Sequence, residues 1–118
     1  MNLFKQFFKK DYSQEAFEAY SLKLPNIIQV RWFRDGKFII GEIEADGYKF
    51  MTQGRNAKEF IEMVNDALFA VYEIPEDYID LLSKTHKFEP NEQAKSLLMD
   101  KSILRSEFGI KKLELAKC

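Results

Sequence analysis

The residues best suited to nucleophilic or metal chemistry are few in this sequence. His86 is the only histidine, and the only cysteine is the last residue, Cys118. Catalytic and zinc sites usually gather several His, Cys or carboxylate side chains, so we expect His86 to be a solvated loop residue and Cys118 an unused thiol. The chain also lacks a nucleophile elbow, a phosphate-binding loop and a paired-glycine dinucleotide turn.

Carboxylates are plentiful, and two pairs of them could in principle share a proton or a metal ion. These pairs are Asp77 with Asp80 and Glu42 with Glu44. Their spacing suits solvated helix faces and salt pairs equally well, and nothing in it favours acid–base chemistry. We therefore predict a non-enzymatic protein with no catalytic residues, no metal site and no cofactor.

A basic and aromatic cluster is the strongest local candidate for binding. Arg31, Arg34 and Lys37 stand close together, with Phe33 and Phe38 among them. Basic residues interleaved with aromatics can bind single-stranded nucleic acid by charge attraction and base stacking. The whole chain adds no such attraction, because 18 basic residues are balanced by 19 acidic ones and the net charge is −1. Nucleic-acid binding through Arg31, Arg34 and Lys37 is therefore the alternative hypothesis.

The composition is that of a folded, soluble domain. With 118 residues, 46% of them apolar, the chain can bury one core without disulfides, so we predict a single domain over residues 1–118. A lone cysteine fits a reducing compartment. Residues 1–12 mix Phe with Lys and lack the apolar stretch of a signal peptide, and no run approaches the roughly 18 apolar residues of a membrane span. We expect a cytoplasmic protein that does not interact with membranes.

The chain is organised around residues 27–72, which read as three short β-strands followed by one amphipathic helix. Two Asp-Gly pairs, Asp35-Gly36 and Asp46-Gly47, separate the strands. Asp-Gly is favoured at the centre of a two-residue hairpin turn, because both central residues of such a turn need positive φ. The pattern therefore predicts an antiparallel meander with both turns centred on Asp-Gly.

These turns set a register that sorts the strand residues onto two faces. The first turn places Trp32 opposite Ile39, and the second places Ala45 opposite Tyr48. One face is almost wholly apolar and comprises Ile28, Val30, Trp32, Ile39, Gly41, Ile43, Tyr48 and Phe50. The other face is mixed and comprises Gln29, Arg31, Phe33, Phe38, Ile40, Glu42, Glu44, Lys49 and Met51.

The mixed face is the predicted binding site. Phe33, Phe38, Ile40 and Met51 need a cover there, because contiguous exposed apolar side chains usually mark an interface. Together with Arg31 they are the residues that we expect to contact a partner protein or a second copy in a homodimer. The remaining alternative is that a Phe-rich N-terminal helix covers them.

The main helix should cover the apolar face. Asn56 is a favoured N-cap, and Glu59 stands where it can complete a capping-box-like exchange. Apolar residues follow at helical spacing, namely Phe60, Val64, Ala67, Leu68 and Val71.

Helical segments are predicted on both flanks of this unit, over residues 1–24 and 76–110. The C-terminal extension begins with a short helix over 76–83. Residues 84–89 suit a fourth strand or a loop equally well. A longer helical pattern then runs over 90–108, and the glycine that follows it is the residue after the C-cap.

The order strand, Asp-Gly turn, strand, turn, strand and helix in residues 27–72 resembles the HicB-like antitoxin family. The most specific stretch begins at Thr52 (TQGRNAKE) and looks like that family's T-x-G-D-T-x-x-E-A approach to its main helix. Thr52, Gly54 and Glu59 match, and Asn56 replaces the usual Thr. An arginine and a phenylalanine stand where an acid and an alanine are usual, and the usual preceding Pro-containing segment is missing.

The resemblance implies an α+β fold, a three-stranded antiparallel meander packed on an amphipathic helix. HicB-like proteins are typically cytoplasmic and bind and mask a small ribonuclease toxin, and many add a C-terminal DNA-binding domain. For this chain the resemblance implies a protein-binding role with a small ribonuclease as partner. Residues 84–108 are too short and too weakly basic for us to predict a DNA-binding domain.

Overall fold

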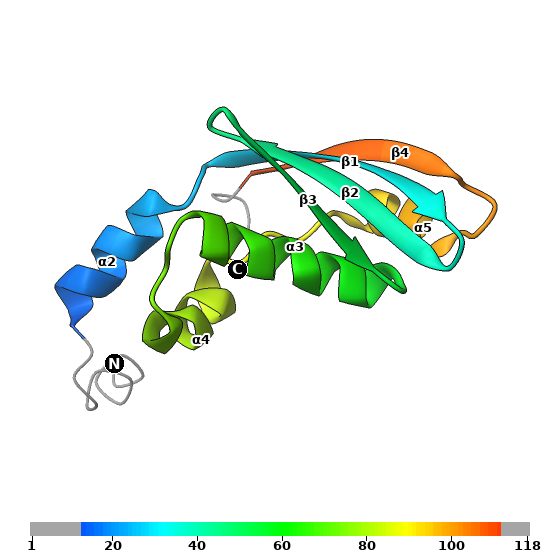
Figure 1. The fold of residues 1–118 in the computed structure, drawn as a ribbon. Coiled ribbons are helices and arrows are strands. Elements are labelled where there is room, and N and C mark those ends of the chain that lie inside the picture. The colour runs from blue at the N-terminus through cyan, green and yellow to red at the C-terminus, as the bar shows by residue number, and fades with distance from the viewer. Residues whose placement is uncertain (1–12, 112–118) are drawn as a thin grey trace.

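The computed structural model describes residues 13–111, and its frame is a four-stranded antiparallel sheet with the described helices on one side (Figure 1). The predicted α+β architecture, a meander packed on an amphipathic helix, is confirmed, and a fourth strand extends it. The strand order is β3-β2-β1-β4. The elements are α2 (Gln14–Lys23), β1 (Ile27–Asp35), β2 (Phe38–Ala45), β3 (Tyr48–Gly54), α3 (Ala57–Val71), α4 (Glu76–Thr85), α5 (Glu92–Met99) and β4 (Arg105–Lys111).

The first hairpin turns one residue later than we predicted. Asp35 pairs with Phe38, so the turn is centred on Gly36 and Lys37, and Trp32 lies opposite Gly41 instead of Ile39. Of the two central residues only Gly36 has positive φ, at 62°. This turn therefore needs glycine at its first central position, as type II′ turns do. The register differs by two residues, which is one full side-chain period, and every predicted face assignment survives.

The second hairpin has the predicted register. Ala45 pairs with Tyr48. Both central residues have positive φ, 49° at Asp46 and 85° at Gly47. This is the backbone of a type I′ turn, for which Asp-Gly is a favoured sequence.

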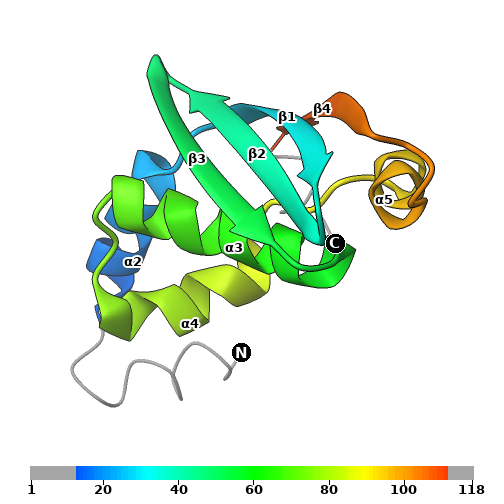
Figure 2. The ribbon, with the colours of Figure 1, turned by 45° about the vertical axis from the view of Figure 1, so that its right-hand side comes forward.

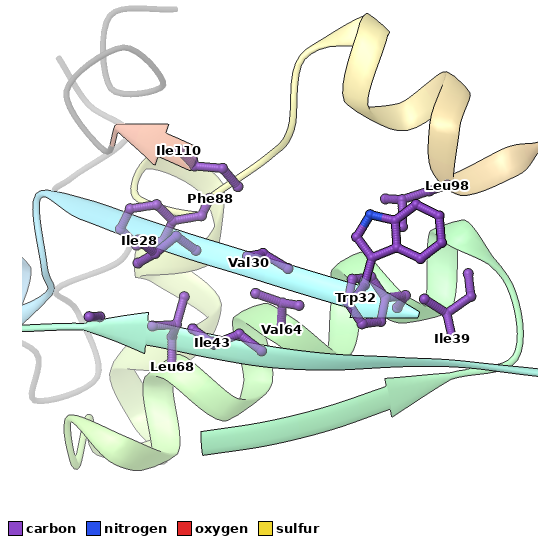
Figure 3. Packing of buried hydrophobic residues seen from close by; sticks show 12 residues of the cluster. Ile28, Val30, Trp32, Ile39, Ile43, Val64, Leu68, Phe88, Leu98 and Ile110 are labelled. Atoms are coloured by element: carbon purple, nitrogen blue, oxygen red, sulfur yellow. The ribbon is translucent and has the colours of Figure 1, made fainter. Parts of the chain in front are cut away.

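The main core lies between the sheet and α3 (Figure 3). Phe60 is fully buried, and its ring occupies the space over Gly41, where a Cβ atom would lie 2.5 Å from Phe60 Cζ. Burying an apolar side chain of this size is worth roughly 1.5–3 kcal/mol, so this packing dominates the fold. The buried residues of this core are Ile28, Val30, Trp32, Ile39, Ile43, Ala45, Phe60, Val64, Leu68, Phe88, Leu98 and Ile110.

The start of α3 confirms the predicted cap. Asn56 Oδ1 accepts a hydrogen bond from Glu59 N–H at 2.8 Å. The Glu59 carboxylate in turn accepts the backbone N–H of Arg55 at 2.8 Å and pairs with the Arg55 guanidinium at 3.1 Å. The capping exchange therefore reaches one residue further back than the standard capping box.

A second, smaller core joins α2 and α4 to the C-terminal half of α3. Ser13 caps α2 by accepting the N–H of Ala16, and its own N–H donates to the Tyr78 hydroxyl of α4 at 2.8 Å. Residues 1–12 of the predicted N-terminal helical segment lie outside the described residues. The buried members of this core are Phe17, Leu24, Phe69, Ile74, Tyr78, Leu81 and Leu82.

The predicted helix over residues 90–108 is wrong in its second half. Helix α5 ends at Met99, and residues 105–111 form strand β4, paired with β1. Side chains from Ser106 to Ile110 alternate between the core and solvent, and that period belongs to a strand. Gly109 consequently lies in mid-strand opposite Gln29 and does not end a helix. The undecided segment 84–89 begins as the last turn of α4 and continues as a linker without strand structure.

Candidate functional site

The side of the sheet that faces away from the helices has no cover among residues 13–111 (Figure 2). Phe33 remains 45% exposed and Met51 58% exposed. We call this surface the open face. It comprises Gln29, Arg31, Phe33, Phe38, Ile40, Glu42, Glu44, Lys49, Met51, Gln53, Arg105 and Glu107.

One row of the open face alternates in charge across β4, β1 and β2 and ends on an apolar residue of β3. The registers place Glu107, Arg31, Glu42 and Met51 side by side, from β4 to β3. Arg31 and Glu42 form an ion pair at 3.6 Å with side chains that are 60% and 38% exposed. Ion pairs this exposed contribute little to stability, so these charges are available to an incoming molecule.

The neighbouring row is apolar at its centre. Phe33 and Ile40 lie opposite each other, between Arg105 on β4 and Gln53 on β3. A shallow groove of about 600 Å³ runs between the two rows, and its lining includes Arg31, Phe33, Met51 and Arg105. The apolar floor and charged rim are the usual composition of a protein-binding surface.

The structure brings together all five predicted partner-binding residues. Arg31, Phe33, Phe38, Ile40 and Met51 belong to the open face, where Phe38 and Ile40 are half-buried by their neighbours in the sheet.

The structure separates two of the three predicted nucleic-acid-binding residues from Arg31. Lys37 lies in the first turn. Arg34 points to the helix side, where its guanidinium donates to the carbonyls of Leu98 at 2.6 Å, Asp100 at 2.9 Å and Ile103 at 2.7 Å. Its charge therefore holds the end of α5 and the approach to β4 against β1.

Sequence reasoning missed Arg105 and Glu107. Both stand beside the predicted site, since β1–β4 pairing puts Arg105 opposite Phe33 and Glu107 opposite Arg31. The signal was a period of two from Arg105 to Lys111, with charges at 105, 107 and 111 and apolar side chains at 108 and 110, which indicates a half-buried strand.

Groups with catalytic potential are dispersed. Within residues 13–111 no three His, Cys, Asp or Glu side chains come close enough together to hold a metal ion. His86 is not the solvated loop residue expected from the sequence: it is half-buried at the end of α4, 2.7 Å from the Thr85 hydroxyl and in edge contact with Phe17. Burial raises the pKa of Tyr72, whose hydroxyl donates to Asp46 at the second turn.

No helix formed by residues 13–111 is long and apolar enough to cross a membrane.

Comparison of the chain with protein-family models, with curated proteins and with solved structures found no match.

Proposed function

We propose that this chain is a non-enzymatic protein-binding domain and that a partner protein docks on the open face. The uncovered apolar side chains of the open face carry the proposal: Phe33 and Met51 are 45% and 58% exposed on a face that no described helix covers (Figure 1). Each such side chain gains roughly 1.5–3 kcal/mol when it is removed from water. Several of them together, rimmed by charges, suit a specific complex.

The charge pattern favours a protein over a nucleic acid. Arg31, Lys49 and Arg105 share the open face with three carboxylates, Glu42, Glu44 and Glu107, so its charges balance. A balanced face offers phosphates no net attraction, whereas a protein surface can offer both signs of charge. Arg34 points to the helix side, where its guanidinium donates to the Leu98 carbonyl. It therefore cannot contact a phosphate on the open face, which weakens the nucleic-acid hypothesis.

The resemblance to HicB-like antitoxins gives the proposal a specific form, in which the partner is a small ribonuclease whose active site is masked. The matching residues lie at the junction of β3 and α3. Gly54 is buried there against the backbone of Phe60, and a Cβ atom would collide with it. Glu59 closes the cap. Gly54 and Glu59, two of the residues that match the HicB-like motif, therefore both have a structural role at the junction of β3 and α3.

The test of the proposal is a double substitution, Phe33→Asp with Met51→Asp. It places two carboxylates on the open face without touching the main core. We expect the affinity for a small ribonuclease-like protein encoded beside this gene to fall at least about 100-fold by calorimetry, because desolvated apolar anchors dominate such interfaces. Met99→Asp is the matched control, since Met99 is 69% exposed on α5 and outside the open face.

Unchanged affinity in a double variant with a native circular dichroism spectrum would exclude the open face as the docking surface. The absence of a ribonuclease-like neighbour gene would count against the antitoxin form. Titration with labelled single-stranded RNA tests the alternative: binding that weakens steeply with salt and is lost in Arg31→Glu would favour nucleic acid as the ligand.

A further inference from the structure

The outer edge of β4 pairs with no other described strand. Strand β4 is antiparallel to β1, and the N–H of Arg34 donates to the carbonyl of Leu104 at 2.8 Å in continuation of the same register. Bonded and non-bonded pairs alternate in an antiparallel ladder. The backbone N–H and C=O groups of Arg105, Glu107 and Gly109 therefore point outward, away from β1.

The charges on this edge complement a second copy of themselves. When two β4 strands run antiparallel about a twofold axis beside Ser106, Arg105 of each copy faces Glu107 of the other. The same register sets Leu104, which is 67% exposed, opposite Phe108. Cross-strand pairs of opposite charge and of apolar side chains both stabilise a sheet.

Neighbouring registers match less well. An axis beside Glu107 sets this carboxylate against its own copy, and an axis beside Phe108 sets Arg105 against Lys111 twice. An axis beside Gly109 sets Glu107 against Lys111 but sets Leu104 opposite no described residue. Only the axis beside Ser106 satisfies both the charges and the exposed leucine.

The opposite edge of the sheet lacks this complementarity. By the same alternation, the outward-pointing residues of β3 are Lys49, Met51 and Gln53. Lys49 has no acidic residue to face in a second copy, and an unpaired lysine on an edge strand discourages pairing. Of the two sheet edges, the edge at β4 therefore has the better charge complementarity to a second copy of itself.

We propose that two copies of this chain pair β4 to β4, antiparallel about an axis beside Ser106, and form one continuous eight-stranded sheet. Phe33 and Met51 stay uncovered in this dimer, so the interface is distinct from the open face. The two grooves, each lined in part by Arg105 and Glu107, then lie on either side of the axis. A protein partner would meet both open faces as one surface.

The test is a pair of charge reversals in the full chain, Arg105→Glu and Glu107→Arg. The wild type is expected to sediment as a dimer in analytical ultracentrifugation. Each reversal creates two like-charge pairs and should raise the dimer Kd at least about tenfold. An equimolar mixture of the two variants restores both opposite-charge pairs, and we expect it to sediment as a heterodimer. Glu62→Arg, on the exposed side of α3, is the control for charge alone.

A wild-type chain that stays monomeric at 100-fold above the concentration used for partner binding would overturn the proposal. A mixture that stays monomeric, although each variant alone has a native circular dichroism spectrum, would overturn it too. If one reversal perturbs folding, the sedimentation of the wild type decides the test. The Phe33→Asp, Met51→Asp variant should remain dimeric, so a failure of the open-face proposal is distinguishable from a failure of this one.

Discussion

The side-chain amide of Asn65 and the backbone of Phe88 are joined by two reciprocal hydrogen bonds. Asn65 Nδ2 donates to the Phe88 carbonyl at 2.8 Å, and the Phe88 N–H donates to Asn65 Oδ1 at 2.8 Å. Both residues are buried. A polar side chain on α3 thus satisfies the backbone of the linker between α4 and α5, and holds the Phe88 ring in the main core.

Asn65→Ala should destabilise the protein by about 2–4 kcal/mol, because it leaves a buried N–H and a buried carbonyl unpaired and each costs roughly 1–3 kcal/mol. Urea denaturation measures the free energy of unfolding. Asp66→Ala, on the exposed neighbouring position, is the control. A loss below about 0.5 kcal/mol would mean that water replaces both hydrogen bonds.

Arg34→Lys should destabilise the protein although it conserves the charge. A lysine ammonium cannot reproduce the planar fork that reaches the carbonyls of Leu98, Asp100 and Ile103. We expect a loss of about 2 kcal/mol, the scale of hydrogen bonds from a charged donor, together with faster amide hydrogen exchange over residues 97–104.

Arg31→Lys is the matched control for that substitution. Arg31 lies on the open face in an exposed ion pair, so the change should leave the free energy of unfolding within about 0.5 kcal/mol of the wild type. Equal losses at Arg31 and Arg34 would contradict the different roles that we assign to them.

The pair Glu89–Lys95 should make stability depend on pH at the acid end. The hydrogen bond from Lys95 at 2.9 Å holds the pKa of the Glu89 carboxyl below its ordinary value. A lowered pKa in the folded state stabilises the fold above the unfolded-state pKa of about 4.3, and the gain disappears as the pH falls through the folded-state value. Glu89→Gln should therefore cost up to about 1 kcal/mol at pH 7, the upper range for an exposed pair.

The cost of Glu89→Gln should vanish below the folded-state pKa, where both proteins carry an uncharged side chain. Thermal unfolding at pH 7 and at low pH measures the two differences. Glu62→Gln, an exposed carboxylate on α3, is the control. A cost that is the same at both pH values would assign the effect to the shape of the side chain.

Local signals explain why the second hairpin and α3 could be predicted from the sequence. Asp46-Gly47 occupies a turn in which both residues have positive φ, and the Asn56 cap is made within four residues. The first turn also contains Asp-Gly, but only Gly36 takes positive φ there. Its register is set by pairing along β1, and the Asp-Gly pair alone does not determine it.

The local signal for strand β4 is ambiguous, and its pairing with β1 decides between strand and helix. Leu104 and Phe108 lie four residues apart, a spacing that suits a helix continuing from α5, and the competing period of two spans only residues 105–111. Arg105 and Glu107 were missed for the same reason, since their place in the site exists only through β1–β4 pairing. Asn65 gave no signal, because its partner is the backbone of Phe88.

The pairing of β1 with β4 also determines when the sheet can be completed during translation. Strands β1 to β3 and α3 can assemble as soon as they emerge, but β1 has one neighbour until residues 105–111 leave the exit tunnel. Until then the second edge of β1 is an unpaired template for strands of other chains. A nascent chain stalled before Arg105 would therefore expose this edge and the incomplete main core beside it to chaperones and to aggregation.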